Sequence, residues 1–175
     1  MNQLGALPGQ KSLFYISDGI PTRPGEDLGV LIADWCNSIP RIPLRELAPT
    51  LRTAGAVANA RRVTLFTFEA GGVKGSTGSS AAFAQNIVSL AADRVRIENQ
   101  QDSLTSLASE TGGLAVLNAN DLAPSFARVA QALRNHYSLG FSPRAKDDGK
   151  EHRIKVKLAK RIPGAQVRFR QSYRG

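Results

Sequence analysis

Short apolar runs alternate with stretches of helical spacing along the first 135 residues of the chain. Three of these runs are bounded by turn residues and predict buried strands, at 12–17, 63–70 and 114–118. Apolar positions three and four residues apart predict helices over 27–38, 44–62, 81–99, 101–113 and 120–135. Because strands that alternate with helices form βαβ units, we predict an α/β fold in which helices flank a parallel sheet.

After residue 135 the pattern changes from helical spacing to strict alternation. Residues 136–143, 152–160 and 166–174 each alternate between apolar and polar positions. Asp148-Gly149 and Pro163-Gly164 supply the turns between them. We therefore predict a three-stranded antiparallel unit that is apolar on one face and basic on the other. The chain then divides into an α/β domain at 1–135 and an antiparallel β extension at 136–175.

Most of the net positive charge lies in this extension. Residues 144–175 hold 11 Lys and Arg against 3 Asp and Glu, whereas the rest of the chain is near neutral. Either the basic face binds a polyanion, or it is a solvated sheet face whose charges oppose edge-to-edge aggregation. Nucleic acid is the less favoured ligand, since the aromatic side chains fall on the apolar face. The residues of the basic face are Arg153, Lys155, Lys157, Arg168, Arg170 and Arg174.

A carboxylate and a glycine end the first predicted strand, in the stretch "LFYISDGIP" at 13–21. One interpretation is that Asp18 caps its own turn through an Asx hydrogen bond, since Asp-Gly is common turn chemistry. The other is that Asp18 is a ligand for a metal or a partner, because open α/β sheets bind at the carboxyl ends of their strands. The residues of this stretch allow both interpretations.

The sequence also excludes or disfavours several classes of protein. One cysteine, Cys36, excludes an intramolecular disulfide and a zinc site of several thiolates. No apolar run approaches the roughly 20 residues that span a bilayer, and "MNQLGALPGQKS" lacks the features of a signal peptide. The loop at 71–80 lacks the Gly-Lys-Ser/Thr order of a phosphate-binding loop. We predict no enzyme, because His136 and His152 have no Ser or Cys partner at recognisable spacing.

Six stretches of the chain, taken in order, resemble the later part of a von Willebrand factor A (VWA) domain. The resemblance is to the VWA-related bacterial proteins of the acidobacterial and deltaproteobacterial type. The stretches are "LPGQKSLFYISDGIPTRPGEDL", "ANARRVTLFTFEA", "LASETGGLAVLNANDL", "YSLGFSP", "DGKEHRIKVKL" and "VRFRQSYRG". Together they cover nearly the whole chain, and it is their combination that is specific.

This resemblance implies a Rossmann-like sheet with a metal-ion-dependent adhesion site at one end. In such sites the metal is held by an Asp-x-Ser-x-Ser motif, a Thr from a middle loop and a further Asp. Only the last of these maps onto this chain, at Asp18, and the sequence contains no Asp-x-Ser-x-Ser. We therefore expect the C-terminal part of a VWA domain, incomplete on its N-terminal side. In it Asp18 would bind Mg²⁺ weakly, or only when the domain is complete.

The function that the resemblance implies is adhesion-type protein binding without catalysis, at the cell envelope or outside the cell. Around Asp18 we expect further ligand-binding residues at the ends of the predicted strands, namely Thr22, Glu69, Gly71 and Asn120. A sheet that lacks its first strands would also expose an apolar edge, so we expect self-association at that edge.

Overall fold

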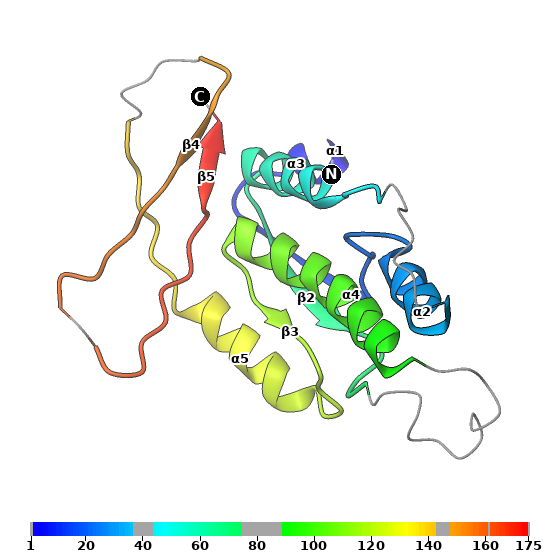
Figure 1. Cartoon of the computed structure of the whole chain (residues 1–175). Helices are drawn as coiled ribbons and strands as arrows, with labels where there is room; N and C mark the ends of the chain where they lie inside the picture. Colours follow the sequence, from blue (N-terminus) through cyan, green and yellow to red (C-terminus); the bar gives the residue numbers. More distant parts are fainter. Residues whose placement is uncertain (1, 37–43, 75–88, 143–147, 161, 175) are drawn as a thin grey trace.

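The α/β part of the chain folds around a three-stranded parallel sheet with flanking helices, as predicted. The computed structural model describes residues 2–36, 44–74, 89–142, 148–160 and 162–174. Strand β1 (Lys11–Ser17) pairs along its whole length with β2 (Val63–Glu69), and β2 pairs with the short β3 (Ala115–Val116). The order β1-β2-β3 places β2 in the centre (Figure 1). This confirms the α/β class and the parallel pairing.

Helix α4 is continuous, although the sequence spacing predicts two helices at 81–99 and 101–113. It is unbroken from residue 90 to 111, while 81–88 lie outside the described residues. No Gly or Pro interrupts 90–111, so nothing stops the helix before Gly112, which ends it with a φ of 74°. None of the described helices is long and apolar enough to cross a membrane. The described helices are α1 (Asn2–Gly5), α2 (Glu26–Cys36), α3 (Ala48–Ala60), α4 (Leu90–Thr111) and α5 (Ala123–Arg134).

Side chains of β2 point alternately to the two faces of the sheet and form a core on each. Val63 and Leu65 pack against α3 and α4 on one face. Phe66 and Phe68 pack with Val129 of α5 on the other face. All residues of β2 are buried, as expected for a central parallel strand with helices on both sides (Figure 1). Strand β2 therefore contributes to the cores on both faces of the sheet.

Strand β1 lies at the edge of the sheet and is half exposed, whereas its apolar sequence predicts a fully buried strand. Phe14 and Ile16 are 43% and 59% exposed. Phe14 stacks on Phe66 with ring centroids 5.7 Å apart, but no strand in the described part of the chain pairs with the outer edge of β1. In most parallel sheets, helices cover both faces, so the exposure of β1 is unusual for a parallel strand. Self-association at this edge stays a prediction.

The extension contains two antiparallel strands in its described residues, so the predicted three-stranded unit is wrong. Strand β4 (Glu151–Arg153) pairs with β5 (Ser172–Arg174). Residues 136–142 pair with no strand among the described residues, and Tyr137 is 94% exposed. Alternation alone does not make a strand, because a strand also needs an edge to pair with and a face to cover. A two-stranded ribbon offers little of either.

The extension contacts the α/β domain at the amino end of the parallel strands. Arg170 Nη1 donates a hydrogen bond of 3.3 Å to the carbonyl of Asn59, near the end of α3. The backbone N–H of Gln171 lies 3.5 Å from the carbonyl oxygen of Glu110, near the end of α4. Figure 1 shows β5 beside these two helix ends. The carboxyl end of the sheet therefore stays clear of the extension.

Gly113 lies where the chain leaves α4 and passes close to β2. A Cβ atom at this position would collide with the carbonyl oxygen of Leu65. We expect Gly113→Ala to lower the free energy of unfolding by about 3 kcal/mol or more, because the buried β2 backbone has no room to move aside. Gly140→Ala is the matched control, since an added Cβ there meets no atom within 4 Å. Equal urea midpoints for the two variants would show that residue 113 is not packed in this way.

Candidate functional site

Polar side chains from all three parallel strands meet at the carboxyl end of the sheet. Asp18 directly follows β1, Glu69 is the last residue of β2, and Asn118 and Asn120 follow β3. The chain after β2 adds Lys74, and helix α4 adds two glutamines. We call this group the strand-end cluster; it consists of Asp18, Glu69, Lys74, Gln100, Gln101, Asn118 and Asn120.

The turn after β1 is held by hydroxyl groups rather than by Asp18. Ser17 Oγ accepts a hydrogen bond of 3.1 Å from the N–H of Gly19. Ser103 Oγ of α4 accepts one of 2.9 Å from the N–H of Ile20. The carboxylate of Asp18 is 59% exposed, and its described contact is an ion pair of 3.7 Å with Lys74. The geometry therefore favours Asp18 as a surface carboxylate over an Asx cap of its own turn.

Glu69 is the buried anion of the cluster, with a completely buried side chain. The Asn118 N–H donates 2.8 Å to Oε2, Gln101 Nε2 donates to both oxygens at 3.1 and 3.0 Å, and Lys74 Nζ lies 3.1 Å from Oε1. Burial by itself would raise the pKa of Glu69, but these hydrogen bonds and the Lys74 charge outweigh it and lower that pKa. Glu69 is thus an ionised group inside the cluster rather than a ligand on its surface.

Lys74 connects the buried carboxylate to the exposed one. Its Nζ lies 3.1 Å from Glu69 Oε1, 3.2 Å from Gln100 Oε1 and 3.7 Å from Asp18 Oδ1. The side chain is 14% exposed. Sequence reasoning missed Lys74, Gln100 and Gln101. The available signal was a single cation in the chain shortly after a strand that ends in Glu69, which predicts a local ion pair.

Residues 70–74 lie against the cluster, and this segment contains two glycines, Gly71 and Gly72, that pack closely against cluster side chains. Asn120 Oδ1 accepts a hydrogen bond of 2.9 Å from the N–H of Val73. A Cβ atom on Gly71 would lie 2.8 Å from Asp18 Oδ1 and 2.9 Å from Lys74 Cε. Gly71 and Asn120 therefore lie at the end of the sheet where the sequence analysis expects them, Gly71 beside Asp18 and Asn120 beside Gly72 and Val73.

Thr22 lies inside the fold, although the sequence analysis expects it among the ligand-binding residues. Its side chain is buried, and its Oγ1 donates a hydrogen bond of 2.9 Å to Asn99 Oδ1 on α4. Asn99 in turn donates to Glu26 Oε2 at 2.9 Å. These bonds attach the loop after β1 to α4, so the Thr22 hydroxyl serves the fold in this arrangement.

The basic side chains of the extension do not share one free face. Arg153, Lys155, Lys157 and Arg168 are exposed. Arg170 is half-buried against α3, where burial first, and then the charge of Arg62, lower the pKa of its guanidinium. The side chain of Arg174 lies outside the described residues.

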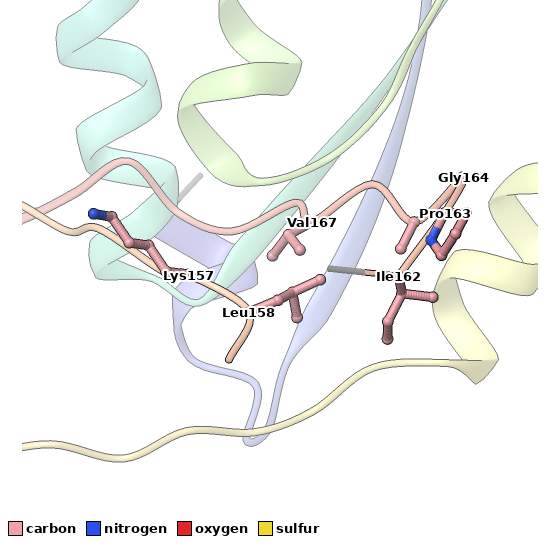
Figure 2. A pocket seen from close by; sticks show the side chains of 7 residues that line it. Lys157, Leu158, Ile162, Pro163, Gly164 and Val167 are labelled. Atoms are coloured by element: carbon pink, nitrogen blue, oxygen red, sulfur yellow. The ribbon is translucent and has the colours of Figure 1, made fainter. Parts of the chain in front are cut away.

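An open hollow of about 520 Å³ lies in the extension, between residues 157–158 and 162–167. Figure 2 shows Leu158, Ile162 and Val167 around it, with the amine of Lys157 extending away from them. Its apolar lining residues are themselves substantially exposed. The hollow is a feature of the loop between β4 and β5, and it shares no residue with the strand-end cluster.

The cluster does not fit a magnesium ion in this arrangement. Mg²⁺ requires several oxygen ligands in near-octahedral geometry. Here the oxygens of Asp18, Glu69 and Gln100 that converge on one point surround the Lys74 ammonium. Within the described ranges no group of three or more His, Cys, Asp or Glu side chains is placed to hold a metal.

Comparisons with known proteins leave the geometry of this chain as the basis for its function. No family model matches the sequence, and searches of curated proteins and of solved structures found no match.

The pairing of Glu69 predicts a stability that depends on pH. Because the folded pKa of Glu69 is below its ordinary value of 4.5, the pairing stabilises the fold above that pH and is lost as pH falls through the folded pKa. We expect Glu69→Gln to cost about 3 kcal/mol at neutral pH, since it leaves the largely buried Lys74 with only the more distant and exposed Asp18 as a charge partner. The difference from the unmodified protein should shrink below pH 4.5 in urea unfolding curves.

The control for this measurement is Glu98→Gln. Glu98 is exposed and lies on α4, the helix that also supplies Gln101 to the cluster. It should change the unfolding free energy by less than about 0.5 kcal/mol at either pH. A Glu69→Gln effect that stays constant between pH 7 and pH 3 would mean that the carboxylate charge does not stabilise the fold.

Proposed function

We propose that this chain is a non-enzymatic, adhesion-type protein-binding domain, the C-terminal part of a VWA-related domain, that binds its partner at the strand-end cluster. The observation that carries the proposal is the convergence of Asp18, Glu69 and Asn120 at the carboxyl end of the parallel sheet. Ligands bind at this end in open α/β sheets. The cell envelope or the exterior remains the expected location, and Mg²⁺ remains a prediction for the complete domain alone.

The composition of the exposed face supports protein binding. Asp18 presents a carboxylate, Asn120 presents an exposed amide, and Ile20 and Val73 add exposed apolar side chains. A small apolar area with polar groups around it is the usual make-up of a protein interface. The N–H of Val73 bonds to Asn120, and the N–H of Ile20 bonds to Ser103, so the loops that carry this face are fixed on the sheet and α4.

The positions of the histidines support the non-enzymatic part of the proposal. His136 Nδ1 lies 2.8 Å from the Leu133 carbonyl, just beyond α5. His152 Nε2 lies 3.0 Å from Asp148 Oδ1 in the extension. Both rings are therefore engaged locally, outside the strand-end cluster, and neither is combined with a nucleophile in these contacts.

Site-specific photo-crosslinking tests the proposed binding face. A photoreactive residue at Val73, which is 56% exposed, should give a discrete crosslinked protein in cells that express the chain naturally. The same residue at Gln10, exposed at the amino end of β1, is the matched control and should give none. Asp18→Asn should weaken the Val73 crosslink by about tenfold, which corresponds to a loss of about 1.4 kcal/mol at a contact residue.

Two results would overturn this function. One is a partner that crosslinks equally well from Gln10 and from Val73, because binding would then not be confined to the carboxyl end of the sheet. The other is a Val73 crosslink that Asp18→Asn leaves unchanged, because the exposed carboxylate would then play no part in recognition.

A second candidate function is polyanion binding by the extension. It is favoured by the burial pattern of 151–157, in which exposed Arg153, Lys155 and Lys157 alternate with half-buried residues. We expect Lys155→Gln/Lys157→Gln to reduce the salt dependence of binding to duplex DNA by a log–log slope of about 2. The exposed pair Arg52→Gln/Arg94→Gln is the control of equal charge change. If both double variants lose the same amount of salt dependence, the effect comes from net charge and not from a binding face on the extension.

A further inference from the structure

We propose that the Lys74 ammonium is the resident cation of the strand-end cluster. It holds the position between the oxygens of Asp18, Glu69 and Gln100 that a divalent metal would otherwise take, and it makes the site independent of metal. The inference concerns the site of the proposed function. It rests on the contacts of Lys74 and not on the identity of a partner.

The geometry around Nζ resembles that of a coordinated cation. Three side-chain oxygens from three separate parts of the fold converge on it, at 3.1, 3.2 and 3.7 Å. They come from the end of β2, from the middle of α4 and from the turn after β1. Two of them belong to carboxylates, and the third is the amide oxygen of Gln100. Oxygen ligands of this kind suit a hard cation.

The charge of the cluster requires a cation at this point. Glu69 is completely buried and ionised, and Asp18 adds a second carboxylate 3.7 Å from Nζ. A buried carboxylate is tolerated when it is paired and hydrogen-bonded. Asn118 and Gln101 supply hydrogen bonds to Glu69 but no charge. Among the described contacts of Glu69, the positive charge therefore comes from Lys74.

The lysine is also held in a way that favours it over a free ion. It is tethered five residues after Glu69, so its effective concentration at the site is far above that of a dissolved metal. Gly71 leaves the space through which the lysine stem passes, since a Cβ there would lie 2.9 Å from Lys74 Cε. A metal that entered beside the ammonium would meet its charge and would find the converging oxygens already engaged.

Manganese binding to lysine variants tests this inference directly. Mn²⁺ is titrated into the full chain and its free concentration is followed by electron paramagnetic resonance. The unmodified protein should bind Mn²⁺ at least about tenfold more weakly than Lys74→Met, because the variant removes a like charge from the site. Asp18→Asn in the Lys74→Met background should weaken the gained binding by about tenfold or more. Lys155→Met, an exposed lysine, controls for the loss of one positive charge.

Thermal unfolding provides a second readout in case Lys74→Met is unstable. Mn²⁺ should raise the Tm of Lys74→Met and leave the Tm of the unmodified protein and of Lys74→Arg unchanged. Mn²⁺ binding of equal strength in the unmodified protein and Lys74→Met would overturn the inference. A Lys74→Met chain that shows neither binding nor a rise in Tm would overturn it too. No partner is present, so these results are independent of the crosslinking that tests the proposed function.

Discussion

The organisation of this molecule depends on the burial of one carboxylate, that of Glu69. It ends the fully buried central strand, so its charge lies where water cannot reach it. A buried charge destabilises a fold unless partners surround it. Asn118 from the loop after β3, Gln101 from α4 and Lys74 from the chain after β2 provide those partners. One group thereby fixes two loops and a helix relative to the sheet.

The backbone around the cluster follows from the same requirement. Asn118 adopts a φ of 53°, a left-handed conformation that is uncommon for residues other than Gly but tolerated by Asn. That conformation accompanies the N–H of Asn118 donating to Glu69, while its side-chain oxygen accepts from Gln101 at 3.0 Å. The turn after β1 is fixed separately, by Ser17 and Ser103. The described hydrogen bonds of this turn therefore do not involve the Asp18 carboxylate, which is largely exposed beside the cluster.

Local pattern made the α/β part of the fold predictable, and the general rule about strand ends located much of the candidate site. The rule predicts Asp18, Glu69, Gly71 and Asn120 at the carboxyl end of the sheet, and they lie there in the structure. The pattern does not report what lies beside a strand. Ile16 in β1 is apolar and yet exposed, because β1 is at the edge in the described fold.

The contacts of the cluster are harder to predict because they join positions far apart in the sequence. Lys74 and Gln100 are 26 residues apart, and Gln101 and Glu69 are 32 apart. Whether such side chains meet depends on how α4 lies across the sheet, which periodicity alone does not set. Thr22 is a second example. It lies in the loop after a strand, but its hydroxyl hydrogen-bonds to Asn99 of α4 in the interior.

The polarity of the fold also explains why the two charged regions lie at opposite ends. In this arrangement α3 and α4 end at the amino end of the parallel strands, where the last helical carbonyls point outward. Arg170 and the N–H of Gln171 are donors, and they contact the carbonyls of Asn59 and Glu110 at that end. A cation near the C-terminus of a helix also interacts favourably with the helix dipole. The basic extension is thus held away from Asp18, and the exposed carboxylate faces solvent without a cation of the extension in its described contacts.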